Sequence, residues 1–258
     1  MTANLEHTTH FKRLTADKFS KAALQYQEFA LVQQQSADYL ISQISPRSNA
    51  ICLDLGAGPG VNSRALKKLF TRVIALDLSA HMLAQIPASL VDFKCCADMD
   101  ALPFQPNSFD AVFSNFASQW SQDFATLLSQ LHQTLKPGGR VYLTNVLAGS
   151  LAEIAQAWQA IDNQKHINSF LSYDEFKDIA DHSSFKVIEL HSKLHQQGFA
   201  TALEAFKSIK AIGANTKMAH QPTGLLGKKA FQTVLSAYPH QQGEFYVSYY
   251  VGYMVLEK

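Results

Sequence analysis

The sequence has few cysteines, no long apolar run and no excess of charge of either sign. Its three cysteines, Cys52, Cys95 and Cys96, form no C-x-x-C pair, so we expect neither a metal site nor a disulfide framework. With 22 Lys and Arg against 21 Asp and Glu, the net charge is only +1. No overall field therefore favours nucleic acid as a partner.

Signals for export and membrane insertion are also missing. The first ten residues lack the basic start and apolar run of a secretion signal. No apolar stretch approaches the ~20 residues that a membrane span needs. Because the few cysteines also fit a reducing compartment, we expect a cytoplasmic protein with no membrane association.

The sequence does contain an alternation of helical and strand patterns. Apolar residues at helical spacing from Phe19 to Ile44 favour one or two helices before the first strand. Short apolar runs then alternate with helical stretches, which is typical of βαβ units and a parallel sheet. Strands are expected at 50–54, 72–77, 92–95, 109–114 and 140–144, helices at 63–70, 82–86 and 124–135, and a turn at 136–139.

The second half of the chain has a different rhythm. Helices are expected at 150–161, 173–182, 201–212 and 228–237, strands at 186–190 and 245–256, and a loop at 213–227. The last two strands are separated by far more chain than a hairpin needs, and such an insertion is usually a lid or a substrate platform. We expect a single domain over 1–258, with N-terminal helices at 1–45, a cofactor-binding core at 46–145, a helical lid at 192–240 and a last strand at 245–256.

The main chemical signal is the loop Asp54-Leu55-Gly56-Ala57-Gly58-Pro59-Gly60, directly after a predicted strand. Glycines let the backbone turn tightly and approach a ligand closely. An open parallel sheet binds its ligands at the carboxyl ends of the strands. Asp77 ends the next strand, where a carboxylate meets ribose hydroxyls. Asp98 follows the third strand, where a carboxylate can accept the adenine amino group.

A dinucleotide site is the obvious rival, and the glycine spacing argues against it. The dinucleotide fingerprint G-x-G-x-x-G/A would place its third glycine at position 61, which is Val61. A pyrophosphate also prefers a helix N-terminus with free N–H groups, and Pro59 removes one of them.

With the strand around Phe109-Asp110 and the turn Leu135-Lys136-Pro137-Gly138-Gly139, these motifs resemble the class I methyltransferases over about residues 45 to 145. The resemblance implies a Rossmann-like, seven-stranded, mostly parallel α/β sheet with an antiparallel last strand, an N-terminal helical segment and a helical insertion before the last strand. It also implies S-adenosyl-L-methionine as cofactor and S-adenosyl-L-homocysteine as product. The expected cofactor-binding residues are Asp54, Gly56, Ala57, Gly58, Gly60, Asp77, Leu78, Met82, Asp98, Met99 and Asn115.

A narrower resemblance covers nearly the whole chain. It is carried by stretches at 19–26, 115–120, 149–160 and 238–243, and above all by Phe206-Lys207-Ser208-Ile209-Lys210-Ala211-Ile212-Gly213-Ala214. In these stretches the chain is similar to the malonyl-[acyl-carrier protein] O-methyltransferase family. The resemblance implies methylation of the free carboxylate of malonyl-acyl carrier protein, a step that starts pimeloyl synthesis for biotin.

Such a reaction places few demands on side-chain chemistry. A carboxylate is already ionised at pH 7, so no general base is required, and positioning in a dry pocket supplies most of the catalysis. The candidates for holding the malonyl group are Tyr26, Gln119, Trp120 and His166, each of which has a plain core or surface role as its alternative. Some family members carry His in place of Ala155 and Arg in place of Ser169, so the group that grips the substrate carboxylate is left open.

The predicted lid also carries lysines. Lys207 and Lys210 lie three apart and share a helix face, and Lys217 follows in the loop. Carrier proteins are acidic, so these lysines are expected to bind the carrier protein or the phosphate of its pantetheine arm. A solvated helix face is the alternative.

The sequence leaves three other functions to compare with this one. One is methylation of a small molecule such as a quinone precursor, and another is a non-catalytic protein that binds S-adenosylmethionine. The intact glycine loop and Asp77 argue against the second. Nucleic-acid methylation is disfavoured because Asn115 is followed by Phe116-Ala117-Ser118 and not by the Pro-Pro of an N/D-P-P-Y/F motif.

Overall fold

The computed structural model describes residues 31–211 and 227–258. The chain divides into two compact units. The first, called here the helical unit, comprises, among the described residues, 31–32, 148–170, 194–211 and 227–250. The second, called the sheet unit, comprises Gln33–Leu147, Leu171–Lys193 and Val251–Lys258. The expectation of a single domain over 1–258 stays a prediction, and each unit is described by itself.

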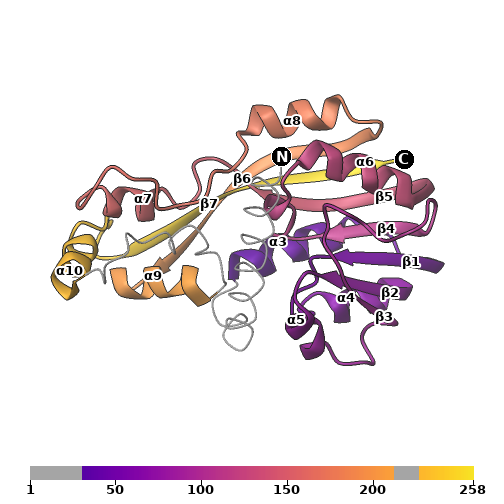
Figure 1. Cartoon of the computed structure of the whole chain (residues 1–258), viewed down its shortest axis with the longest axis horizontal. Helices are drawn as coiled ribbons and strands as arrows, with labels where there is room; N and C mark the ends of the chain where they lie inside the picture. The colour runs from indigo at the N-terminus through magenta and orange to yellow at the C-terminus, as the bar shows by residue number, and fades with distance from the viewer. Residues whose placement is uncertain (1–30, 212–226) are drawn as a thin grey trace, which may run out of the picture. The chain divides into compact units, whose positions relative to one another are not determined.

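Seven strands form one sheet with the order β3-β2-β1-β4-β5-β7-β6 (Figure 1). The pairs β1–β2, β1–β4, β2–β3 and β4–β5 are parallel, whereas β5 and β7 are antiparallel. This confirms the expected Rossmann-like, mostly parallel sheet with an antiparallel last strand. The strands are β1 (Arg47–Leu55), β2 (Phe70–Asp77), β3 (Phe93–Cys96), β4 (Phe109–Ser114), β5 (Leu135–Val146), β6 (Lys186–Phe199) and β7 (Phe245–Glu257).

The strand order shows at which edge of the sheet a ligand is expected to bind, and we call this the ligand edge. From β1 the chain moves outward to β2 and β3, and it then returns to β4 on the other side of β1 and continues to β5. Because parallel crossovers are right-handed, this reversal places α4 (Ser63–Leu69) and α5 (Ala80–Gln85) on the face opposite α6 (Phe124–Thr134). The carboxyl ends of β1 and β4 therefore flank the switch point, where doubly wound sheets bind ligands.

Hydrophobic burial between the sheet and α6 forms the core of the sheet unit. Phe124, Leu127, Leu128 and Leu131 recur at helical spacing on α6 and are all buried. They pack with buried strand residues and with α8 (Tyr173–Asp181), whose Phe176 stacks on Phe124 at 5.5 Å between ring centroids.

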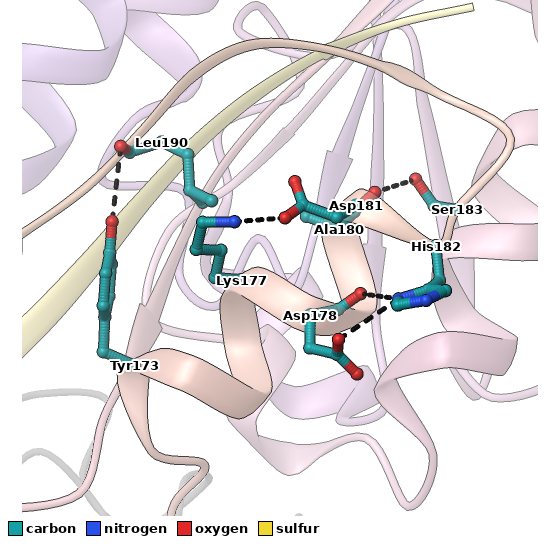
Figure 2. A network of polar contacts seen from close by, with 8 residues as sticks. All are labelled: Tyr173, Lys177, Asp178, Ala180, Asp181, His182, Ser183 and Leu190. Carbon is teal, nitrogen blue, oxygen red and sulfur yellow. Dashed lines mark hydrogen bonds and ion pairs between the residues drawn. The ribbon is translucent and has the colours of Figure 1, made fainter.

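Helix α8 is stabilised at both ends by local polar contacts. A capping box joins Ser172 and Glu175 at its start. Toward its end, Lys177 pairs with Asp181, and His182 contacts both the carboxylate and the backbone carbonyl of Asp178 (Figure 2). These contacts with Asp178 raise the pKa of His182 above its usual value. These local contacts stabilise α8 at both ends, and its buried Phe176 packs in the core of the sheet unit.

The helical unit contains α7 (Ala152–Trp158), α9 (Ala202–Ala211) and α10 (Lys228–Ser236). Phe206 of α9 lies at its aromatic centre, against Trp158, Phe231 and Tyr238. The Tyr238 hydroxyl donates to the carbonyl of Tyr246 in β7 (2.7 Å). Strands β6 and β7 contribute residues to both units.

Most expected elements are found, and several of their bounds differ from the expected ones. Strand β5 begins at Leu135, the last residue of the expected helix at 124–135, because Leu135 pairs with Phe109 of β4, and it runs through the expected turn at 136–139. Within that turn the Gly138 N–H donates to the Lys258 carbonyl, and the Lys258 N–H donates to the Gly139 carbonyl. Strand β6 continues to Phe199, into the expected lid at 192–240. Helix α7 begins two residues late because Leu151 has a left-handed φ of 60°.

Helix α3 (Leu31–Ser42) confirms the later part of the expected N-terminal helices, and 1–30 lie outside the described residues. The loop expected at 213–227 also falls outside them, except for Gly227. Over the ranges that the structure does describe, no helix is long and apolar enough to cross a membrane.

Close packing of β7 against α8 yields a stability prediction. A Cβ at Gly252 would lie 2.8 Å from Cε1 of Phe176 and 3.0 Å from Cδ1 of Leu147, both buried. Gly252→Ala should therefore lower the free energy of unfolding by about 1–3 kcal/mol through overpacking. The measurement is urea denaturation, with Gly198→Ala as the matched strand control, because its Cβ would meet Tyr246 only at 3.4 Å. Equal stability of the two variants would contradict this reading of the contact.

Candidate active site

The glycine loop, Asp54–Gly60, joins the end of β1 to α4 and is tied to the neighbouring strand. The N–H groups of Gly56 and Ala57 both donate to the carbonyl of Leu76 in β2, at 2.8 and 3.0 Å. The Gly58 N–H donates to Asp77 Oδ2 (2.9 Å). The loop is therefore held over the ends of β1 and β2, at the predicted ligand edge.

Gly56 is required here by both conformation and space. Its φ is +72°, and a Cβ at this position would lie 2.3 Å from the Cβ of Ala117, which follows β4. Around Gly58, by contrast, a Cβ would meet nothing within 4 Å. The loop thus packs tightly against the segment after β4 at Gly56 and opens outward at Gly58.

Asp77 shapes the same edge. Its Oδ1 accepts the Ser79 N–H at 2.8 Å, while its Oδ2 accepts from Gly58. Burial raises the pKa of Asp77, and the backbone N–H donors oppose that shift. Each carboxylate oxygen accepts a backbone N–H and keeps lone-pair capacity for a ligand hydroxyl.

The predicted residues after Asp77 divide into an outward and a buried one. The side chain of Leu78 is 37% exposed at the strand end. Ser79 caps α5 by accepting the Met82 N–H (3.2 Å), and Met82 itself is 1% exposed. Leu78 therefore lies at the surface of the edge, whereas Met82 lies beneath it.

The loop after β3 completes this edge of the sheet. The Ala97 N–H donates to the Asp77 carbonyl (3.1 Å), which places the loop beside β2. Asp98 Oδ1 accepts the Asp100 N–H (3.0 Å). Met99 reaches back toward the glycine loop, with its Cε 3.9 Å from a Cβ built at Gly56. The structure thus gathers the glycine loop, Asp77 and the Asp98–Met99 pair at one edge.

Asp54 is the most unusual group of this edge. It is 2% exposed, and its Oδ2 makes no hydrogen bond with any residue in the described part of the chain. Burial raises the pKa of Asp54 to about 7, with the charge of Asp77 acting in the same direction. A buried carboxylate with an unused oxygen, next to a second carboxylate, is suited to a positively charged ligand.

The segment after β4 brings in the other candidates. Gln119 and Trp120 lie in a 3-10 turn, η1 (Ser118–Trp120). Gln119 Nε2 donates to the Phe116 carbonyl (2.8 Å), and its buried Oε1 lacks a partner among the described residues. The Asn115 amide is bonded to Gln33, Ser36 and Thr144. If Asn115 contacts the cofactor as predicted, it does so through its backbone or through the second N–H of its side-chain amide.

The remaining candidates belong to the helical unit or lie outside the described residues. His166 belongs to the helical unit, where it stacks on Trp158 at 4.2 Å and contacts Asp162 Oδ1 at 2.7 Å. Ser169, where some family members carry Arg, accepts a bond from Lys165 Nζ (2.8 Å), so a cation lies here in this chain too. Tyr26 and Lys217 lie outside the described residues.

Lys207 is exposed on α9, which also carries Lys210 at its C-terminal end. Of the Lys210 side chain the structure describes nothing. The expected docking surface is therefore supported by one placed lysine and by the helical spacing.

The structure adds two residues that the sequence did not single out. Ala117 packs on Gly56, and Ser63 has a buried hydroxyl with no hydrogen bond in the described ranges. Ser63 is the first residue of α4 and lies near Asp54, whose raised pKa it opposes only in part. Its place at a helix start after a glycine loop was the signal available in the sequence.

Comparison with known proteins follows this geometry. The family described as "Methyltransferase domain" matches residues 53–143, which span β1 to β5. The YcgJ protein of Bacillus subtilis superposes with a TM-score of 0.60 at 17% identity, covering 87% of this chain and 98% of that one. A phosphoethanolamine N-methyltransferase of Haemonchus contortus superposes at 0.53 with 23% identity, covering 87% and 52%. The fold and the site define a class I, S-adenosylmethionine-dependent methyltransferase.

Curated relatives narrow the class. A malonyl-[acyl-carrier protein] O-methyltransferase of Salmonella typhimurium is 36% identical over 96% of this chain and 98% of its own length. One from Pseudescherichia vulneris is also 36% identical, with the same coverage. The chain belongs to the malonyl-[acyl-carrier protein] O-methyltransferase family.

The residues present fit S-adenosylmethionine, which carries an ammonium and a sulfonium besides its ribose and adenine. Asp54, with its unused buried oxygen, would hold the cationic methionyl end. Asp77 would bind the ribose hydroxyls, and Asp98 would bind the adenine amino group, as the sequence predicts. The open side of Gly58 leaves space for such a ligand beside the loop.

The pKa of Asp54 gives a pH prediction for the ligand-free protein. The folded-state pKa of about 7 lies above the unfolded value of 3.8. Between these values the folded state holds a proton that the unfolded state has lost, so stability falls as pH rises through this window, by about 4 kcal/mol in all. Asp54→Asn should abolish this part of the pH dependence, measured by urea denaturation from pH 4 to pH 8. Parallel profiles for both proteins would show that Asp54 does not titrate in this range.

Asp77 gives a prediction on affinity. Asp77→Ala removes the ribose acceptor and frees the Gly58 and Ser79 N–H groups, so affinity for S-adenosylhomocysteine should fall by about 1–3 kcal/mol. Isothermal titration calorimetry measures the change. The matched control is Asp110→Ala, since Asp110 also accepts a backbone N–H, from Ile51, but lies at the start of β4 and away from the site. A similar loss in both variants would mean that the effect is on folding.

Proposed function

We propose that the chain transfers the methyl group of S-adenosylmethionine to the free carboxylate of malonyl-acyl carrier protein and so forms its methyl ester. The observation that carries the proposal is the extent of the likeness to the named relatives. It covers 96% of this chain, well beyond the methyltransferase domain at 53–143. The parts that distinguish methyltransferases from one another, before β1 and after β5, are thus included in the match.

The proposed chemistry relies on placement. When bound, S-adenosylmethionine supplies an electrophilic methyl group on a positively charged sulfur. The malonyl carboxylate is ionised at neutral pH and needs no general base, which agrees with a site edge built from carboxylates and amides. In this proposal Gln119 and Trp120 orient the malonyl group beside the cofactor edge, and the packed segment around them excludes water.

Neither a metal nor a nucleic acid has a part in the proposal. The sulfonium already activates the methyl group, so the reaction needs no Lewis acid. Within the described residues no group of three or more His, Cys, Asp and Glu side chains is arranged to hold a metal ion. The cytoplasmic location stays a prediction, which the proposed carrier-protein substrate supports.

Docking of the carrier protein is the second part of the proposal. Lys207 is exposed on α9 and is followed at helical spacing by Lys210. An acidic carrier protein would bind these lysines and bring its pantetheine arm to the active site. Lys217 is proposed to join them.

The decisive experiment is methyl transfer from radiolabelled S-adenosylmethionine. Malonyl-acyl carrier protein, malonyl-coenzyme A and the unloaded carrier protein serve as acceptors in parallel. Base-labile label on the malonyl-loaded carrier is the expected result, because a methyl ester hydrolyses in base. No label on any of the three, with S-adenosylhomocysteine binding intact, would overturn the proposed substrate and favour a small-molecule acceptor.

Charge reversal tests the docking surface. Lys207→Glu with Lys210→Glu should raise the KM for malonyl-acyl carrier protein about tenfold at low salt and leave that for malonyl-coenzyme A or another free thioester within about twofold. Lys186→Glu with Lys193→Glu makes the same charge change at two exposed lysines outside α9. An equal rise on both substrates, or with the control pair, would refute docking at α9.

A further inference from the structure

We propose that Thr144 and Asp100 are positioning residues, which clamp the segment Asn115–Gln122 against the glycine loop and so set the geometry of methyl transfer. This inference rests on the proposed function, because the segment carries Gln119 and Trp120. We call Asn115–Gln122 the acceptor segment. Both clamps and the segment lie within the sheet unit.

Thr144 bonds the first half of the acceptor segment three times. Its Oγ1 donates to Asn115 Oδ1 (2.8 Å) and accepts the Phe116 N–H (3.0 Å). Its backbone carbonyl accepts from Ser118 Oγ at 3.1 Å. Thr144 is fully buried near the carboxyl end of β5 and pairs with Tyr253 of β7, so the anchor itself has little freedom.

The backbone at Phe116 explains why the segment needs an anchor. Phe116 has a φ of +52°, in the left-handed region that a bulky side chain rarely occupies. Such a conformation persists only where its surroundings hold it. The bond from the Phe116 N–H to Thr144 Oγ1 holds one side of this peptide, and Gln119 closes the turn by donating to the Phe116 carbonyl.

Asn115 extends the first clamp to α3. Its Oδ1 accepts from Ser36 Oγ (2.9 Å) as well as from Thr144, and its Nδ2 donates to the Gln33 carbonyl (2.9 Å). One amide thus joins β5, α3 and the acceptor segment. The side chain of Asn115 therefore has a structural role, which does not depend on what its backbone binds.

Asp100 bonds the second half of the segment. Its Oδ1 accepts from Ser121 Oγ (2.5 Å), and both of its carboxylate oxygens accept from the Gln122 N–H, at 3.3 and 3.1 Å. Its own N–H donates to Asp98 Oδ1, and its carbonyl accepts from Gln130 Nε2 of α6. The carboxylate therefore joins the loop that carries Asp98 to the end of the acceptor segment.

The position of the segment matters because it touches the glycine loop. Ala117 lies where a Cβ on Gly56 would be, with only 2.3 Å between the two Cβ positions. A segment held at Thr144 and Asp100 keeps Gln119 and Trp120 at a fixed distance from that loop. Small displacements of positioned groups cost large factors in rate, up to about a hundredfold for 1 Å.

Kinetics with isosteric variants test the first clamp. Thr144→Val keeps the volume and loses the hydroxyl, and it should lower kcat for malonyl-acyl carrier protein about 10- to 100-fold with the Kd for S-adenosylhomocysteine within about threefold. Thr144→Ser keeps the hydroxyl and should stay within about threefold of the wild-type kcat. Loss of S-adenosylhomocysteine affinity equal to the loss in kcat, or a kcat unchanged in Thr144→Val, would overturn the positioning role.

The second clamp supplies a variant at a partly exposed site, should Thr144→Val not fold. Asp100→Ala removes the bonds to Ser121 and Gln122, and it should lower kcat about tenfold with the Kd for S-adenosylhomocysteine within about threefold. Asp92→Ala is the control, because Asp92 also accepts a backbone N–H, from Val73, but contacts no residue of the acceptor segment in any bond described. A wild-type kcat in Asp100→Ala would overturn the second clamp.

A readout independent of the acceptor separates this inference from the proposed function. The chain has two tryptophans, Trp120 and Trp158. In 5-fluorotryptophan-labelled protein, Trp158→Phe assigns the fluorine resonance of Trp120. With S-adenosylhomocysteine bound, that resonance should be single and sharp in the wild type and in Thr144→Ser, and broadened or split in Thr144→Val and Asp100→Ala.

The two failures are then distinguishable. If the wild type labels no malonyl acceptor, the proposed function fails, and the Trp120 resonance still decides whether the clamps order the segment. An unchanged, sharp Trp120 resonance in both clamp variants would overturn the inference even if the proposed function held.

Discussion

Asp77 is the residue on which the ligand edge depends. One carboxylate at the end of β2 accepts an N–H from the glycine loop and another from the start of the next helical turn, and its own carbonyl receives the loop that follows β3. The glycine loop, the start of α5 and the loop after β3 are thereby all bonded to this one residue. Burial works against this arrangement by raising the pKa of Asp77, and the backbone donors compensate. The second carboxylate nearby, Asp54, has one oxygen, Oδ2, without a hydrogen bond to any described residue, and this oxygen is suited to a cation.

The fold of the sheet unit could be predicted from the sequence because its signals are local. Each strand from β1 to β4 is a short apolar run, and β1 and β2 each close on or next to an acid, so that the strand ends were marked by chemistry as well as by hydrophobicity. The glycine loop, Asp77 and the Asp98–Met99 pair were expected at one edge from the topology of parallel sheets, and the structure brings them together.

The rest depends on contacts between distant residues, which leave no local mark. The early start of β5 comes from the pairing of Leu135 with Phe109 of β4. The bonds of Gly138 and Gly139 to Lys258 then tie this part of β5 to the far end of the chain. The sequence does not predict the full length of β6, because its later part, 192–198, is mostly polar and exposed and therefore has the composition of a loop. Thr144 looks like any β-branched strand residue, and only its bonds to Asn115, Phe116 and Ser118 distinguish it. The sequence offers His166 as an isolated imidazole, and the structure shows that this side chain stacks on Trp158 and contacts Asp162.

The contact between Gly56 and Ala117 has a consequence for how this site can vary in evolution. The two positions lie 61 residues apart in the printed sequence and share space for one methyl group. A methyl group gained at position 56 could be accommodated only if position 117 lost its own, and a residue larger than alanine at 117 would press on the loop directly. Because the left-handed φ of Gly56 disfavours a side chain in any case, position 56 is expected to remain glycine and position 117 to remain alanine or glycine. The acceptor segment thus limits which substitutions the glycine loop can accept.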